Sequence, residues 1–196
     1  PDFHFGVIEL VKQGKLSEER INQSVRKILE TKFRLGLFEN PYTKEENAQK
    51  VLFNTAHQQT ALESARQSIV LLKNDKNLLP LDSKKYKKVL VTGPNVNNQS
   101  ILGDWALEQP NENVVTIYQG LKKVRPDVQF NLCEFDTNLR KMKPEQVDKA
   151  VQMAKENDLV IVAVGENSMR YKWNEKTCGE NSDRYDINLY GLQQAL

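Results

Sequence analysis

The most constraining feature of the sequence is residues 159–165, Leu-Val-Ile-Val-Ala-Val-Gly, which are apolar at every position. A run this short and this uniformly apolar is typical of a parallel strand that is covered on both faces. Residues 144–157 come just before it, begin with a proline and carry apolar residues at helical spacing. A helix joined so closely to a buried strand is part of a βαβ unit, so the sequence predicts an α/β fold.

Three other segments are predicted to be strands of the same sheet. Residues 87–93 and 69–72 are apolar enough for buried strands, and residues 128–132 alternate as a half-buried strand does. The expected architecture is a mainly parallel sheet flanked by helices. In such sheets, ligands meet the loops beyond the carboxyl ends of the strands, which are residues 94–113 and 166–186 here.

The first part of the sequence predicts helices rather than strands. An amphipathic helix covers about residues 5–13, and Ser17 with two following glutamates is a typical start for the next helix, which Gly36 ends. Residues 37–50 are polar and irregular, as in a linker, and a further helix spans about residues 55–68. The predicted division is therefore 1–38, a linker at 39–54, and a main domain at 55–196.

Charge and cysteine content exclude several classes of protein. The 28 Lys and Arg residues oppose 26 Asp and Glu residues, and a net charge of +2 argues against a dedicated nucleic-acid binder. Cys133 and Cys178 are too few for a disulfide scaffold, and no Cys/His cluster indicates a metal. A disulfide, a catalytic thiol and two unpaired residues remain as alternatives. No apolar run approaches the ~20 residues that cross a bilayer.

Neither end of the sequence has the features expected of a natural terminus. The first residues contain no basic region followed by an apolar stretch, so they are no secretory signal. Residues 190–196 are predicted to be the start of a helix, with no cap or basic last turn after it. We therefore expect a fragment of a longer protein.

Residues 165–184 form the most unusual loop of the sequence. Carboxylates, cations and two aromatic residues follow one another without a convincing helix or strand, and long loops of this kind are usually functional or disordered. Rings that cover a pyranose and carboxylates that bind hydroxyls or transfer protons would suit a sugar site, and a solvated charged loop is the alternative. Thr-Gly-Pro-Asn at 92–95 lacks both phosphate-loop patterns and is interpreted as a turn that ends a strand.

Several segments match, in order, those of one enzyme family. They are residues 61–74 with 78–81, Gly-Asp-Trp at 103–105, Val-Gly-Glu at 164–166, Gly-Glu-Asn-Ser-Asp-Arg at 179–184, and, upstream, residues 16–38. Together they resemble the end of the first domain and much of the second domain of glycoside hydrolase family 3, the β-glucosidase and β-xylosidase group.

This resemblance implies a parent with a (β/α)8-like barrel, an α/β sandwich and an active site between them. Residues 1–38 would be the last helices of the barrel, and residues 55–196 an incomplete sandwich. The parent would be a retaining exo-β-glycosidase that removes terminal non-reducing β-linked glucosyl or xylosyl residues. Its nucleophile, an Asp of the barrel, is absent from this chain, and Asp104 is rejected for that role because it lies in the second domain.

The resemblance also implies the roles of individual residues. It places the general acid/base on Glu180, with Glu166 as the runner-up, while Asp183, Arg184 and Trp173 would support the loop or contact the sugar. No cofactor or metal is expected. The expected partners are a β-linked oligosaccharide or glycoside and the barrel domain of the same polypeptide, with no nucleic acid and no membrane insertion.

Two expectations concern the protein as a whole. The family resemblance favours a periplasmic or secreted parent, and this chain alone is expected to be inactive because it lacks the nucleophile. A non-catalytic carbohydrate-binding or interaction module of the α/β class is the alternative function.

Overall fold

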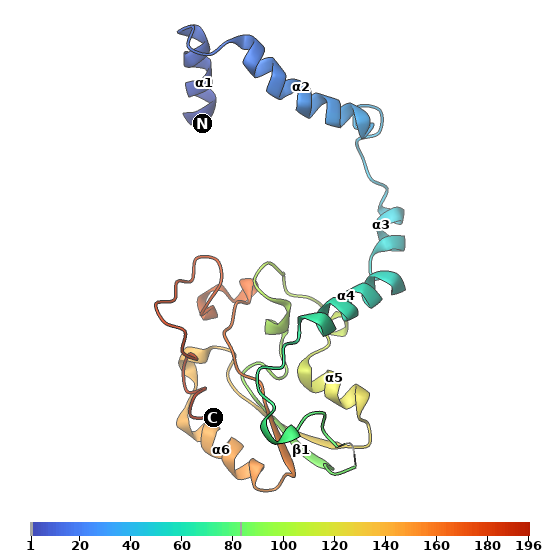
Figure 1. Ribbon diagram of the computed structural model, residues 1–196, viewed down its shortest axis with the longest axis vertical. Helices are drawn as coiled ribbons and strands as arrows, with labels where there is room; N and C mark the ends of the chain where they lie inside the picture. Colours follow the sequence, from blue (N-terminus) through green and yellow to red (C-terminus); the bar gives the residue numbers. More distant parts are fainter. Residues whose placement is uncertain (1, 83) are drawn as a thin grey trace. The chain divides into compact units, whose positions relative to one another are not determined.

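The structure is a computed structural model that describes residues 2–82 and 84–196 and divides into two compact units, with the boundary between Lys73 and Asn74 (Figure 1). The first unit is helical, and the second contains the sheet. The helices of the first unit are α1 (Asp2–Lys12), α2 (Glu18–Arg34), α3 (Glu45–Val51) and α4 (Thr55–Ser68).

Helix α2 begins where its sequence signal predicts. The Ser17 hydroxyl accepts a hydrogen bond from the backbone N–H of Arg20 at 3.2 Å, which satisfies one of the free amides of the first turn. Gly36 follows the helix with φ at +65°, a conformation that favours glycine. Both predicted ends of this helix are confirmed.

Helix α3 lies inside the segment that was expected to be irregular. Its first turn carries Glu45 and Glu46 and its last turn carries Lys50, charges that suit the two ends of a helix dipole. At this short length there is no apolar repeat from which to recognise it. The prediction of an irregular chain at residues 37–50 is therefore wrong at its end.

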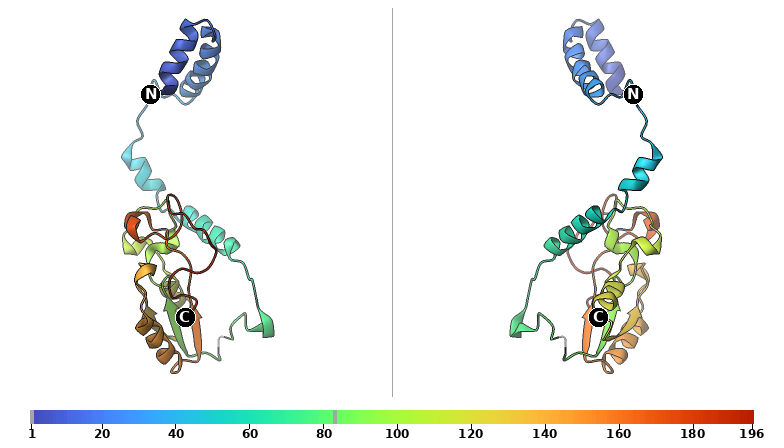
Figure 2. Two further views of the ribbon diagram at one scale, coloured as in Figure 1. Left: turned by 90° about the vertical axis from the view of Figure 1, so that its left-hand side faces the viewer. Right: turned by 90° about the vertical axis from the view of Figure 1, so that its right-hand side faces the viewer.

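The predicted strand at residues 69–72 is also wrong. These residues follow α4 as a segment without regular structure (Figure 2). Their side chains are exposed, Ile69 by 78% and Leu72 by 92%. A strand needs a neighbour for its backbone hydrogen bonds. Within the described residues, this segment pairs with no strand.

The second unit is built on three parallel strands. They are β1 (Lys88–Gly93), β2 (Gln129–Glu134) and β3 (Leu159–Val162), in the order β2-β1-β3. Helix α5 (Ile117–Val124) connects β1 to β2, and α6 (Pro144–Ala154) connects β2 to β3. The predicted parallel sheet with flanking helices is confirmed. Short 3-10 turns complete the unit: η1 (Asp75–Asn77), η2 (Gln99–Leu102), η3 (Asn111–Asn113), η4 (Leu139–Lys141) and η5 (Arg170–Glu175).

The core lies on both faces of β1. Leu90, which is fully buried, packs with Cys133 and with Ala150 of α6, whereas Val89 and Val91 face the side covered by α5. Consecutive residues of a strand point to opposite faces, so one strand anchors both helical layers (Figure 1).

Strand β3 is less buried than its sequence predicts. It ends at Val162, and Val160 and Val162 are 38% and 43% exposed. Helix α6 contacts β1 and β2, so the face of β3 that carries these valines is only partly covered. The apolar run does form a parallel strand, but the prediction that both of its faces are buried is wrong.

Residues 191–195 form turns instead of the predicted helix start. Gly191 has φ at +67°, and a Cβ there would lie 2.4 Å from the backbone oxygen of Leu139. The left-handed backbone at Gly191 is incompatible with a right-handed helix through this residue. Among the helices of the described residues, none has the length and apolar character to cross a membrane.

Candidate active site

The site is built from two loops that leave the carboxyl ends of β1 and β3. The backbones of the two strands are very close at these ends. If Gly93 carried a Cβ atom, that atom would lie only 2.3 Å from the backbone oxygen of Ala163. Gly93 also has φ at +110°, so only glycine suits this position. Pro94 and Asn95 form a turn directly after it, which confirms the interpretation of this sequence as a turn.

Asn167 fixes the start of the loop after β3. It is 1% exposed, and its side-chain amide donates to the backbone oxygen of Thr137 at 2.9 Å while its side-chain oxygen accepts from Met169 N–H at 2.9 Å. Its backbone exchanges hydrogen bonds with Thr177, at 3.0 Å to the hydroxyl and 2.8 Å from the amide. The loop therefore folds back on itself within ten residues.

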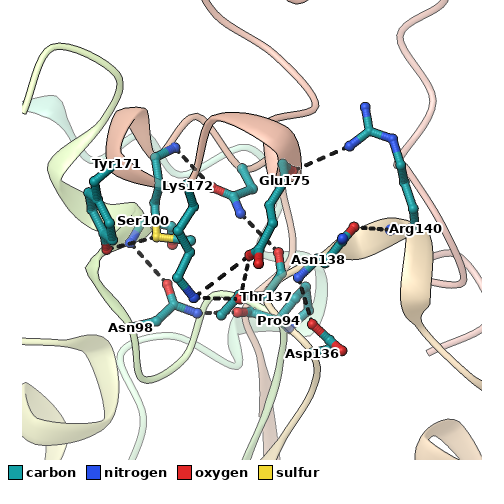
Figure 3. Close-up of polar contacts among 12 residues, drawn as sticks. Pro94, Asn98, Ser100, Asp136, Thr137, Asn138, Arg140, Tyr171, Lys172 and Glu175 are labelled. Carbon is teal, nitrogen blue, oxygen red and sulfur yellow. Dashed lines mark hydrogen bonds and ion pairs between the residues drawn. The ribbon is translucent and has the colours of Figure 1, made fainter. Parts of the chain in front are cut away.

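Polar contacts also hold the 3-10 turn η5, which lies inside this loop. Figure 3 shows the Glu175 carboxylate beside the Thr137 hydroxyl, 2.9 Å away, and the Lys172 ammonium 3.7 Å away. Arg140 donates to the backbone oxygen of Glu175 at 3.4 Å. The hydroxyl of Tyr171 contacts the Met169 sulfur, and burial raises the pKa of this phenol. These polar contacts hold the turn in a way that composition does not reveal.

A cluster of charges joins this loop to the loop after β1. Asp104 accepts from the Lys176 ammonium at 2.8 Å through Oδ1 and from the backbone N–H of Glu180 at 2.7 Å through Oδ2. These bonds, the Lys176 bond first, hold the pKa of Asp104 below its usual range. The Arg170 Nε lies 3.6 Å from the same carboxylate.

The Glu180 side chain lies at the solvent-accessible side of this cluster. It is 44% exposed and forms an ion pair with Arg170. The Arg170 guanidinium lies 3.8 Å from the centroid of the Trp105 ring and 5.6 Å from that of Trp173. Trp105 is 78% exposed. An accessible carboxylate, a cation and two aromatic rings therefore meet at one place.

Glu166 belongs to a second cluster. Its Oε1 lies 2.5 Å from Arg184, which also contacts Asp186 at 3.0 Å and the backbone oxygen of Asn188 at 2.6 Å. The bond to Glu166 is the main cause of a raised Arg184 pKa. Glu166 and Arg184 are only 24% and 20% exposed. This pair ties the end of β3 to the far end of the loop.

The two remaining predicted site residues, Trp173 and Asp183, lie in different places. Trp173 lies with the Glu180 cluster, where its ring centroid is 4.4 Å from the Lys176 ammonium. Asp183 is exposed, has no partner among the described residues, and lines a cavity of about 480 Å³ together with Arg184 and Tyr190. Within the described chain, no His, Cys, Asp or Glu side chains form a group that could hold a metal ion.

The sequence interpretation missed Asp104, Arg170 and Lys176 as members of the site. Asp104 carried a signal, because it belongs to the Gly-Asp-Trp segment in a loop expected to meet ligands. Arg170 and Lys176 carried none, since one more cation in a charged loop is normally solvated. Lys176 is instead 2% exposed.

Comparison with known proteins places this site in context. The family model described as the glycosyl hydrolase family 3 C-terminal domain matches residues 69–196. A beta-xylosidase of Formosa agariphila is 36% identical over 90% of this chain and 24% of its own length, and a periplasmic beta-glucosidase of Salmonella typhimurium is 31% identical over 95% of this chain and 27% of its own.

A solved structure gives the same result. A beta-glucosidase involved in saponin metabolism from intestinal bacteria matches with a TM-score of 0.80 and 31% identity, over 100% of this chain and 29% of that one. The chain therefore spans about a quarter of the length of the relatives it matches.

Proposed function

The chain belongs to glycosyl hydrolase family 3, and on that premise we propose that it is part of a retaining exo-β-glycosidase and supplies its general acid/base, Glu180. The substrate class would be terminal β-linked glucosyl or xylosyl residues. The observation that carries the proposal is the half-exposed Glu180 carboxylate, which pairs with Arg170 and stands on a main chain held by Asp104 and Lys176. The Arg170 guanidinium in turn lies against two aromatic rings.

A retaining site needs two carboxyl groups about 5–5.5 Å apart, one ionised to attack and the other protonated to assist departure of the leaving group. Asp104 is unsuited to attack, because both of its oxygens accept hydrogen bonds and its side chain is only 14% exposed. The nucleophile would instead come from the barrel domain, of which residues 1–38 would be the last helices. The chain alone would then hydrolyse no glycoside.

Glu166 is the less suitable proton donor of the two candidates. It is held against the Arg184 guanidinium, which also contacts Asp186, and it is less exposed than Glu180. A proton donor must reach the departing oxygen, which favours the more accessible carboxyl. Glu166 and Arg184 would support the loop. Trp173, beside the Glu180 cluster, and the exposed Asp183 would contact the sugar.

The test is Glu180→Gln in the full-length protein, assayed on aryl β-glucosides whose phenols differ in acidity. Because glutamine cannot donate a proton, we expect kcat/KM to fall by about 10²–10⁴-fold for poor leaving groups and far less for activated ones. The exposed Glu112, mutated to Gln, is the matched control. An equal loss on every substrate would favour the non-catalytic carbohydrate-binding module instead.

A second measurement tests the proposed absence of the nucleophile. The purified 196-residue chain should release no phenol from an activated aryl glucoside, and release above the buffer rate would contradict the proposal.

A periplasmic or secreted parent is also proposed; the name of the Salmonella relative supports it.

A further inference from the structure

We propose that Asp104 and Lys176 form a main-chain clamp that positions Glu180 by holding its backbone and not its carboxylate. This inference rests on the proposed function and deepens it. Asp104 comes from the loop after β1 and Lys176 from the loop after β3, so the clamp joins two segments 72 residues apart. Both would be positioning residues, because neither contacts the Glu180 side chain.

Lys176 is the buried half of the clamp. Its side chain is 0% exposed, and its ammonium donates to Asp104 at 2.8 Å and to the backbone oxygen of Glu180 at 2.9 Å. A buried ammonium is tolerated only when it is paired and hydrogen-bonded. The amine therefore has a fixed place, and the carbonyl of Glu180 is fixed with it.

Asp104 holds the backbone on the other side of the same residue, at its N–H. Its Oδ2 accepts the Glu180 N–H at 2.7 Å, and it approaches so closely that a Cβ on Gly179 would lie 2.4 Å from that oxygen. Gly179 has φ at +91°, which also favours glycine. The residue before Glu180 is therefore shaped to let the Asp104 carboxylate reach the backbone.

The clamp leaves the Glu180 side chain adjustable. Its N–H and C=O are both held, whereas its carboxylate is 44% exposed and meets Arg170 alone among the described residues. A fixed backbone with an accessible carboxyl suits a group that must donate a proton and later accept one. A displacement of about 1 Å in such a group can lower a rate by about 10²-fold.

The test compares Asp104→Asn with Glu180→Gln in the full-length protein. We expect Asp104→Asn to lower kcat/KM by about tenfold to 10²-fold for poor leaving groups, with a much smaller loss for activated ones. Asp127→Asn is the matched control. Asp127 forms its ion pair with Arg125 just before the amino end of β2, whereas the site loops follow the carboxyl ends of the strands. That control should behave as the natural protein does.

The outcomes separate the two proposals. If Glu180→Gln shows the leaving-group dependence and folded Asp104→Asn does not, the clamp is overturned and the proposed function stands. If Glu180→Gln shows no such dependence, the proposed function falls first. Should Asp104→Asn fail to fold because Lys176 loses its partner, the double variant Asp104→Asn/Lys176→Met removes both charges and must show the same dependence.

Discussion

Asn167→Leu tests whether the loop after β3 is held by buried hydrogen bonds. Leucine has a similar volume but can neither donate to the Thr137 backbone oxygen nor accept from Met169 N–H, which are both at 2.9 Å. Each buried group that loses its partner costs about 1–3 kcal/mol. Two such groups give a loss of about 2–6 kcal/mol in the free energy of unfolding, a large share of the ~5–15 kcal/mol that stabilises a typical domain.

The assay is urea unfolding of the 196-residue chain, followed by tryptophan fluorescence. Its two tryptophans are Trp105 and Trp173, which both lie beside Arg170, so the signal reports on the site loops directly. With a denaturant slope of about 1–3 kcal/mol per M, a loss of about 3 kcal/mol lowers the midpoint by about 1–3 M.

The control for this experiment is Asn113→Ala, at an exposed position, which should change stability by less than about 0.5 kcal/mol. If Asn167→Leu moves the midpoint no further than this control, the two side-chain bonds do not stabilise the loop and the reasoning is refuted.

Three further predictions follow from burial and charge. The Lys176 bond lowers the pKa of Asp104 in the folded state, so its stabilising contribution is fully present above the ordinary carboxyl pKa of about 4 and is lost as pH falls through the lowered value. Urea midpoints measured below about pH 4 should therefore fall more steeply in the natural chain than in Asp104→Asn, and parallel curves would contradict this. Leu90→Ala should cost about 2–5 kcal/mol in urea unfolding, because the side chain is fully buried; a cost below 1 kcal/mol would show that the site collapses around the smaller residue. Gly93→Ala should lose at least about 1–3 kcal/mol, since the backbone is left-handed and Ala163 blocks the new Cβ, and unchanged thermal unfolding would refute that.

Much of the fold follows from local sequence signals. The Ser17 cap, the apolar repeats of the helices and the apolar run of β3 each depend on residues close together in the chain, and the structure contains the corresponding elements. Burial was harder to predict. Whether residues 69–72 or Val160 are covered depends on which distant segment packs against them, and no local pattern reports that.

The residues of the site were likewise predictable only where a short sequence segment identifies them. Motif resemblance identified Glu180 and Glu166 as candidates, because each stands in a recognisable short segment. The partners of these residues could not be found by that route: Lys176 and Asp104 meet only after two strands pair and their loops fold back. A buried lysine in a charged loop differs from a solvated one through its tertiary contacts alone.

The ion pair between Glu180 and Arg170 places a requirement on the proposed chemistry. An ion pair needs an ionised carboxylate, whereas a proton donor needs a protonated one, so Glu180 must separate from Arg170 before the leaving group departs. Arg170 has other partners for that state, since Asp104 lies 3.6 Å from its Nε and the Trp105 ring 3.8 Å from its guanidinium. In the proposed clamp, Asp104 and Lys176 would hold the backbone of Glu180 throughout. The exchange of partners would therefore need only side-chain rotation, which is fast compared with the turnover of most enzymes.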